Sequence, residues 1–147
     1  MRLLVQRVKE AQVWIRGSQV SRIDRGLLVF VGIRSDDEER DIVWLSDKLV
    51  HLRIFEDSFG KMGHDVMTVG GSLLIVSQFT LYGELQKGRR PDFAMAAPSS
   101  VARPLYERFV ESCRARWDRI EVGVFGEDMD IHLVNWGPVT LWLESPR

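Results

Sequence analysis

The stretch Gly71-Ser72-Leu73-Leu74-Ile75-Val76-Ser77-Gln78-Phe79-Thr80-Leu81 decides how the rest of the chain can fold. It starts with glycine, continues through four consecutive aliphatic residues and then becomes polar. A continuous apolar run of this kind is typical of a β-strand that is buried on both faces, as in sheets with parallel strands. In such sheets, ligands bind beyond the carboxyl ends of the strands. Ser77, Gln78 and Thr80 therefore either belong to a binding site or simply end the strand.

The segments around this strand predict an α/β fold. Short apolar segments near the start of the chain are joined by turns, which favours antiparallel pairing. A helix is expected over residues 35–52, with four acidic residues in its first turn, where the helix dipole favours negative charge. A second helix is expected over residues 98–117, capped by Pro98-Ser99-Ser100. The other expected strands cover residues 3–8, 12–15, 20–24, 27–33, 120–124, 129–134 and 139–143.

This order of elements predicts a single domain over residues 1–147. A mixed sheet would curl into a barrel-like layer, and the two main helices would pack against it. Residues 57–60, Asp-Ser-Phe-Gly, are suited to a β-turn before the central strand. Cys113 is the one cysteine, and it falls on the apolar stripe of the second helix, so we expect it to be buried as a packing residue.

The composition excludes several classes of protein. Hydrophobic residues make up 45% and charged residues 28% of 147 residues, which is typical of soluble globular proteins. The net charge of −1 attracts no nucleic acid to the molecule as a whole, so any basic patch must be local. The longest apolar run, residues 26–33, is too short to cross a membrane, and the first residues lack the apolar core of a signal peptide. We therefore expect a cytoplasmic protein.

Common catalytic motifs are missing from the sequence. His51, His64 and His132 are scattered, and none has a second ligand at metal-binding spacing, so no metal site is expected. The chain also lacks the glycine-rich phosphate loop, the dinucleotide-binding turn and the nucleophile elbow, so no cofactor is expected.

Two further features have an ordinary and a functional interpretation. Lys87, Arg89 and Arg90 lie in the long irregular stretch of residues 82–98, just beyond the polar strand end. They are either a solvated loop or a group that binds the phosphates of an extended substrate. The dipeptide Gly137-Pro138 is either a turn or, with a cis bond, a fixed device that presents its carbonyl oxygens in an unusual direction.

The chain resembles the D-aminoacyl-tRNA deacylases, also known as D-tyrosyl-tRNA deacylases, from Met1 to its end. The combination of Ser-Gln-Phe-Thr and Gly-Pro-Val-Thr at this spacing is highly specific, although each motif alone would be weak. The matching motifs are Val5-Gln6-Arg7-Val8, Leu52-Arg53-Ile54-Phe55, Val76-Ser77-Gln78-Phe79-Thr80-Leu81-Tyr82, Lys87-Gly88-Arg89-Arg90-Pro91, Val124-Phe125-Gly126 and Gly137-Pro138-Val139-Thr140.

The resemblance implies an enzyme that hydrolyses the ester between a D-amino acid and the terminal adenosine of tRNA. The family works without a metal ion, as a homodimer in which the cis Gly-Pro pair enters the partner's site and rejects L-amino acids. By this resemblance, Gly137 and Pro138 form the chiral gate and Arg7 braces it. The family usually has aspartate before the gate, whereas this chain has Trp136, an aromatic residue suited to packing across an interface.

The resemblance also assigns the reaction centre and the adenine site. Ser77, Gln78, Phe79 and Thr80 line the reaction centre, and Phe125 and Met129 flank the terminal adenine. The residues around Gly63-His64-Asp65 also depart from the family's usual run, outside these motifs.

The residues suggest how the ester would be hydrolysed. Ester hydrolysis needs an activated water and a stabiliser for the oxyanion, and the sequence offers no clear general base. The backbone N–H groups at Phe79 and Thr80 are suited to an oxyanion hole, and we expect the Thr80 hydroxyl to position groups rather than attack. The resemblance assigns the remaining activation to the 2′-hydroxyl of the substrate ribose. The alternatives are a non-catalytic module that binds the tRNA end, and a thioester or nucleotide hydrolase on a similar fold.

Overall fold

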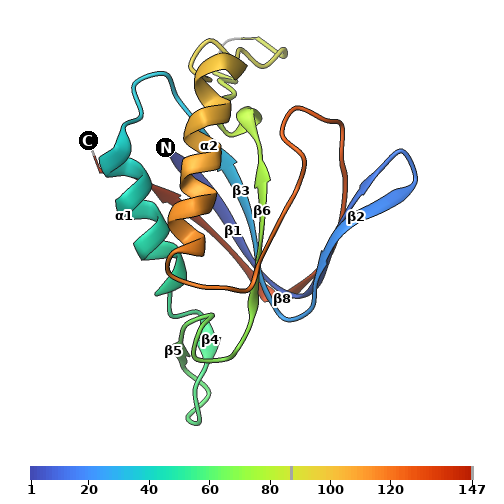
Figure 1. The fold of residues 1–147 in the computed structure, drawn as a ribbon, viewed down its shortest axis with the longest axis vertical. Coiled ribbons are helices and arrows are strands. Elements are labelled where there is room, and N and C mark those ends of the chain that lie inside the picture. The colour runs from blue at the N-terminus through green and yellow to red at the C-terminus, as the bar shows by residue number, and fades with distance from the viewer. Residues whose placement is uncertain (87, 147) are drawn as a thin grey trace.

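One long strand, β1 (Arg2–Ile15), joins the parts of the sheet (Figure 1). It pairs antiparallel with β2 (Ser18–Ile23), β3 (Gly26–Gly32) and β8 (Asp130–Glu144), which confirms the antiparallel pairing predicted for the start of the chain. The computed structural model describes residues 1–86 and 88–146. The prediction of two strands in place of β1 is wrong. The polar pair Lys9-Glu10 stays in the strand because Glu10 still pairs with Val134 of β8.

The predicted buried strand is β6 (Ser72–Ser77), and all four of its aliphatic residues are buried. It lies parallel to β3 and to β7 (Ile120–Val122), and the sheet has the order β2-β1-β3-β6-β7. The strand ends at Ser77, and the chain then forms a short 3₁₀ helix, η1 (Phe79–Tyr82). The Gln78 N–H still donates to the Val31 carbonyl at 2.8 Å, and beyond it the backbone bonds become local to η1.

The last strand, β8, spans the region where the sequence predicted two separate strands, so that prediction is wrong. Both of its halves pair with β1, and the pairing is irregular between them, opposite residues 6–10 of β1. The dipeptide Gly137-Pro138 lies within this irregular part, and for that reason it does not end the strand. The sheet forms the predicted nearly closed, barrel-like layer, in which β1 pairs with β8 on one side and with β2 and β3 on the other.

Two helices, α1 (Glu39–Val50) and α2 (Ser99–Arg114), lie side by side against the sheet, as predicted (Figure 1). The hydroxyl groups of Ser46 and Ser112 are 2.8 Å apart, and Arg108 forms an ion pair with Glu39. No side-chain hydrogen bond caps α2, so the predicted cap is wrong. The Pro98 carbonyl instead accepts bonds from the N–H groups of residues 101 and 102, each at 2.9 Å, and the two serines are the first helical residues.

Alternate residues of β6 face two separate cores, which explains why the strand is continuously apolar. Leu73 and Ile75 belong to the core under the helices, whereas Leu74 and Val76 belong to a second core inside the curl of the sheet. Cys113 is buried in the core under the helices, as predicted, and burial raises the pKa of its thiol to about 12.

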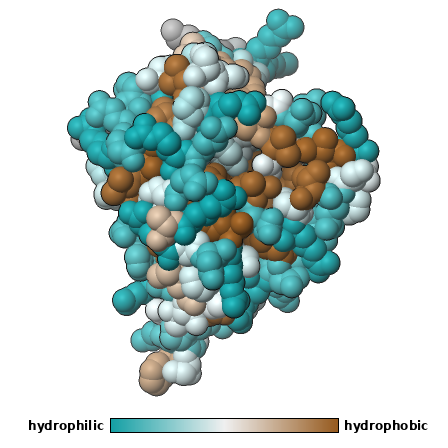
Figure 2. All heavy atoms as spheres, viewed as in Figure 1, coloured by the Kyte–Doolittle hydropathy of each residue, from teal (hydrophilic) through white to brown (hydrophobic). Residues whose placement is uncertain are grey.

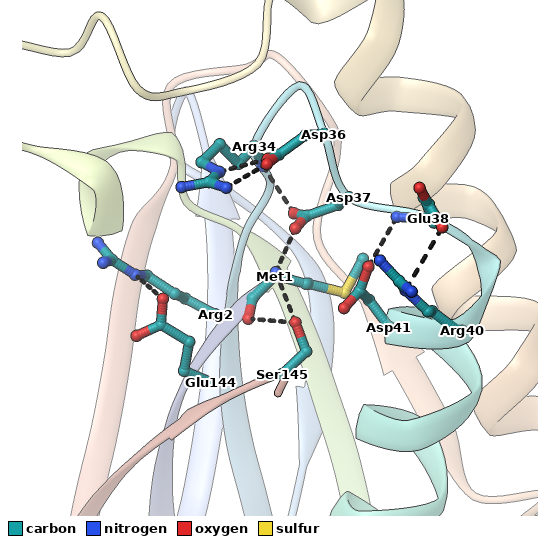
Figure 3. Close-up of polar contacts among 10 residues, drawn as sticks. All are labelled: Met1, Arg2, Arg34, Asp36, Asp37, Glu38, Arg40, Asp41, Glu144 and Ser145. Carbon is teal, nitrogen blue, oxygen red and sulfur yellow. Dashed lines mark hydrogen bonds and ion pairs between the residues drawn. The ribbon is translucent and has the colours of Figure 1, made fainter. Parts of the chain in front are cut away.

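A polar cluster occupies the loop before α1 (Figure 3). Asp37 accepts a bond from the Met1 amine, which also donates to Ser145 Oγ at 2.9 Å, and Asp36 pairs with Arg34. The helix therefore begins only at Glu39, and the prediction of four acidic residues in its first turn is wrong. Asp36 and Asp37 fix the loop instead of the helix end.

A small hairpin, β4 (Phe55–Glu56) and β5 (Met62–His64), projects from the end of the molecule opposite the start of α2 (Figure 1). The predicted β-turn is confirmed, because the Gly60 N–H donates to the Asp57 carbonyl at 3.1 Å. Within residues 1–86 and 88–146, no helix is long and apolar enough to cross a membrane.

Candidate functional site

A cavity of about 630 Å³ opens at the carboxyl ends of β3 and β6. Its walls come from Ser77-Gln78-Phe79, from the start of α2 and from residues 125–129, which lead into β8. Figure 2 shows apolar residues exposed on this side of the molecule, between α2 and β2. The cavity is where ligands bind in sheets with parallel strands, and its volume is typical of small-molecule sites.

The residues assigned to the reaction centre adjoin this cavity. Ser77, Gln78 and Phe79 line it, whereas Thr80 is exposed and lies just outside the lining. The Gln78 side-chain amide donates to Thr80 Oγ at 2.5 Å, which fixes the direction of that hydroxyl. Phe79 and Thr80 open a helix, where the first N–H groups have no acceptor within the helix. Among the described residues, neither of these two N–H groups has a backbone acceptor.

The two residues assigned to the adenine site, Phe125 and Met129, also line the cavity. The Phe125 ring centroid is 5.6 Å from that of Tyr106, and the phenol of Tyr106 donates to the Ile75 carbonyl at 2.9 Å. Burial raises the pKa of the Tyr106 phenol. The Met129 sulfur accepts the Val124 N–H at 3.4 Å, which ties it to the chain beside β7. Contacts with Tyr106 and with the Val124 N–H therefore fix the positions of Phe125 and Met129 in the cavity wall.

The residues assigned to the gate form a second group. The Gly137-Pro138 bond is cis, and Gly137 has φ +136°, which favours glycine. Arg7 is buried; its Nε donates to the Trp136 carbonyl at 2.9 Å and its Nη1 to the Ile54 carbonyl at 2.6 Å. A Cβ on residue 137 would lie 2.9 Å from Arg7 Nη2, so a side chain there would displace the guanidinium.

Trp136, the residue that departs from the family pattern, packs within its own chain. The Arg7 guanidinium lies 4.6 Å from the centroid of the Trp136 ring. The ring centroid of Phe55, in β4, is 6.3 Å from that of Trp136. The tryptophan therefore covers the buried cation.

Within one chain, the gate and the cavity lie at opposite ends of the sheet. Val8 pairs with Asn135 next to the gate, and also with Gly26 at the start of β3. The cavity lies beyond the other end of β3, where Val31 pairs with Ser77. Five residue steps of extended strand separate Gly26 from Val31, a distance of about 17 Å. No gate residue lines the cavity.

The basic segment follows η1, and its described arginines, Arg89 and Arg90, do not line the cavity. Arg89 and Arg90 are exposed, and Lys87 lies outside the described residues. Glu84 and Asp92 close the base of this segment with two backbone hydrogen bonds of 2.7 and 2.9 Å. Phe93, the next residue, does line the cavity and packs edge-on against Phe79 with centroids 5.0 Å apart. The basic segment is thus attached directly to the cavity wall.

Sequence reasoning missed several residues of this site. Phe93, Ser99, Glu127 and Asp128 line the cavity, and Arg103 contacts Phe125 from outside. Phe93 follows the basic motif directly, a signal that could have been used, whereas the carboxylates looked like ordinary turn residues. None of the histidines lines the cavity, and the described part of the chain contains no cluster of three or more His, Cys, Asp or Glu side chains arranged to hold a metal ion.

Comparison with known proteins identifies the fold and family. The profile of the family described as D-Tyr-tRNA(Tyr) deacylase matches residues 4–144. The chain belongs to this deacylase family. It is 54% identical to the D-aminoacyl-tRNA deacylase of Thermomicrobium roseum, over 99% of this chain and 94% of that protein. The resemblance inferred from the sequence motifs is therefore confirmed.

Two solved structures share the fold of this deacylase. The c-Myc DNA Unwinding Element Binding Protein is 41% identical, with a TM-score of 0.95 over 100% of both chains. The structure of a probable eukaryotic D-amino acid tRNA deacylase is 21% identical, with a TM-score of 0.84 over 97% of both chains, which shows the fold alone. The predicted mixed α/β architecture is confirmed by these neighbours.

Proposed function

We propose that this deacylase hydrolyses the ester bond between a D-amino acid and the 3′ end of tRNA, and releases the free D-amino acid and tRNA. One observation carries the proposal: a single cavity gathers the polar end of β6 and the pair Phe125 and Met129. The names of close relatives with full coverage support it. The whole domain, residues 1–147, would serve this one reaction in the cytoplasm, where tRNA is aminoacylated.

The roles of the cavity residues follow from their positions. The N–H groups of Phe79 and Thr80 would hold the oxyanion that forms when water attacks the ester carbonyl. Gln78 would keep the Thr80 hydroxyl directed, and Ser77 would line the floor beneath the ester. The 2′-hydroxyl of the terminal ribose would activate the water, so the proposed reaction uses no metal ion or cofactor.

The gate would come from a second copy of the chain. About 17 Å of strand separates the gate from the cavity in one chain, so one chain would not bring Gly137-Pro138 to its own ester. A two-fold dimer supplies each cavity with one gate, because both copies present the same surface. Leu141 and Trp142 follow the gate on β8 and are 36% and 48% exposed, which suits an interface. Sedimentation at micromolar concentration should show a dimer, and a monomer alone would contradict this arrangement.

The basic segment would bind the tRNA beyond its last nucleotide. Arg89 and Arg90 are exposed next to the Phe93 wall of the cavity, and we place Lys87 in the same role from the sequence. Arginine and lysine there would contact phosphates of an RNA that continues outward from the cavity.

The deciding experiment follows ester loss from D-Tyr-tRNA, L-Tyr-tRNA and Gly-tRNA with the purified protein. We expect rapid loss of the D ester and none of the L ester, because the gate excludes an L side chain by steric contact. Glycine has no side chain to exclude, so we also expect slow loss of the glycyl ester at high enzyme concentration. Binding of tRNA without turnover of any ester would identify a non-catalytic tRNA-end-binding module instead. Turnover of thioesters or nucleotides without tRNA would contradict both.

A further inference from the structure

Arg103 is an exposed cation at the edge of the cavity. It has no role in the proposed reaction. Its Nη2 donates to the Phe125 carbonyl at 3.3 Å, and its guanidinium carbon lies 4.8 Å from the centroid of the Phe125 ring. Ala102 precedes it and lines the cavity, as does Phe125. Arg103 therefore stands directly outside the cavity wall, on the far side of the residue assigned to the adenine.

The position of Arg103 is fixed by α2. Arg103 and Tyr106 are three residues apart on this helix and so lie on the same face, and both contact the Phe125 ring. The neighbouring Gly126 has a φ of +83°, which favours glycine, and a Cβ there would make only ordinary contact with Arg103 Nη2, at 3.7 Å. The guanidinium is thus held in one place at the rim before any ligand arrives.

The charge of Arg103 is not neutralised within the part of the chain that the structure describes, where it takes part in no ion pair. Other arginines of α2 differ: Arg108 pairs with Glu39, and Arg114 pairs with Glu111 at 2.8 Å. A guanidinium has five N–H donors, and one of them is used on the Phe125 carbonyl. The remaining donors can meet an anion that leaves the cavity along this wall.

We propose that Arg103 binds the phosphate that joins the terminal adenosine of the substrate to the preceding nucleotide. The inference rests on the proposed function, in which the adenine contacts Phe125. A cavity of about 630 Å³ holds one nucleoside and its aminoacyl group, so the RNA must leave it at the 5′ side of that nucleoside. The first charged group outside is this phosphate, and arginine matches its geometry with paired N–H donors. Arg89 and Arg90 would then meet phosphates farther along.

Acidic residues at the rim of the cavity restrict where a phosphate can bind. Glu127 and Asp128 line the cavity close to Phe125 and repel a phosphate, although Glu127 lies 3.6 Å from Arg16. A phosphate beside Phe125 is therefore favoured only where Arg103 faces it.

The test measures the affinity of adenosine and of its 5′-methylphosphate, which carries one negative charge as the tRNA backbone does. We expect the methylphosphate to bind the wild-type protein about 10-fold more tightly, the range for a charge-assisted hydrogen bond at an exposed site. Arg103→Gln removes the charge but keeps a polar side chain, and should abolish this advantage, while its affinity for adenosine stays within about 2-fold. Arg103→Lys should retain part of it. Arg114→Gln removes the same charge from the far end of α2, about 16 Å away, and should change nothing.

Two results would overturn the proposal. The advantage of the methylphosphate could survive in Arg103→Gln, or this variant could lose affinity equally for both ligands, which would mean that Arg103 only supports Phe125. Inorganic phosphate should not compete with adenosine at concentrations near the dissociation constant of the methylphosphate. The outcome is independent of catalysis: loss of the proposed function would appear as intact D-Tyr-tRNA with the wild-type protein, whatever the ratio of affinities. With an active enzyme, the KM of D-tyrosyl esters should follow the affinities, while kcat changes less than about 2-fold.

Discussion

Replacing Arg7 with lysine should test how firmly the gate is held. The substitution keeps a basic side chain at the site, although an ammonium is more strongly hydrated than a guanidinium and costs more to bury. Arg7 donates to the Trp136 carbonyl at 2.9 Å and to the Ile54 carbonyl at 2.6 Å from two different nitrogens, and its planar group lies 4.6 Å from the Trp136 ring centroid. A lysine ammonium is a single point on a flexible stem and cannot reach both carbonyls with this geometry.

The expected loss can be worked from these contacts. One hydrogen bond from a charged donor is worth about 1.5–3 kcal/mol, and the guanidinium–tryptophan contact about 0.5–2 kcal/mol. Lysine keeps one of the two bonds and part of the ring contact, so we expect Arg7→Lys to lower the free energy of unfolding by about 2–3 kcal/mol. For a chain of this length, that corresponds to a fall in Tm of about 6–10 °C.

Thermal unfolding at one protein concentration measures this loss, because a dimer makes Tm depend on concentration. The matched control is Arg22→Lys, an exposed arginine with surface ion pairs, which should change stability by less than about 0.5 kcal/mol. Arg7→Lys should also lower the ratio of D- to L-Tyr-tRNA cleavage, since the carbonyl before Gly137 loses its fixed partner. An Arg7→Lys protein with unchanged Tm and unchanged ratio would show that Arg7 does not brace the gate.

Three further predictions concern other parts of the chain. Thr80→Ala should slow single-turnover cleavage of D-Tyr-tRNA by about 100-fold or less, the cost of a lost positioning contact, whereas a fall near a million-fold would make Thr80 the nucleophile. Reversing the charge of Arg89 and Arg90 together should weaken binding of tRNA and flatten its salt dependence, with little effect on a D-aminoacyl-adenosine ester; equal losses on both substrates would mean that the segment shapes the cavity. The Cys113 thiol, with its pKa raised to about 12 by burial, should react with a thiol reagent at pH 8 only after unfolding in urea, and rapid labelling of the folded protein would contradict its placement.

The elements that could be predicted from the sequence are those with an unambiguous hydrophobic period. The four aliphatic residues of β6 alternate between two cores. A short strand whose residues are all apolar is stable when both of its faces are buried, so this pattern predicts its position. The length of β1 could not be predicted, because Lys9-Glu10 interrupts the apolar pattern and remains in the sheet only through pairing with β8, more than 120 residues away. The same long-range pairing turns residues 130–144 into one strand despite Gly137-Pro138.

Part of the candidate site could also be predicted from the sequence pattern, and part could not. The polar end of β6 could be placed at a cavity from the strand pattern alone, since the carboxyl ends of parallel strands share one edge. The roles of Phe125, Met129 and Gly137-Pro138 came from the resemblance to a family, because nothing local in a phenylalanine or a methionine indicates an adenine. Arg103 carried no signal in the sequence: an exposed arginine of an amphipathic helix looks like a solvated charge until the Phe125 segment is folded against it.

The strand β1 connects the two halves of the site through two arginines, Arg2 at its start and Arg7 near its middle. Arg2 donates to Glu144 at 3.1 Å (Figure 3). It also donates to the Leu81 carbonyl of η1 at 3.1 Å, and its guanidinium lies 4.3 Å from the Tyr82 ring centroid. Arg7 does the same for the carbonyl before the gate. Both side chains belong to one continuous strand. The register of β1 against β3 and β8 therefore determines the position of the η1 backbone and that of the gate at the same time. A shift of one residue would turn both arginines to the opposite face of the sheet and release η1 and the gate at once. The irregular pairing between Gln6 and Glu10 therefore falls on the β8 side of β1, while the pairing with β3, which fixes the distance between the two halves, is regular throughout.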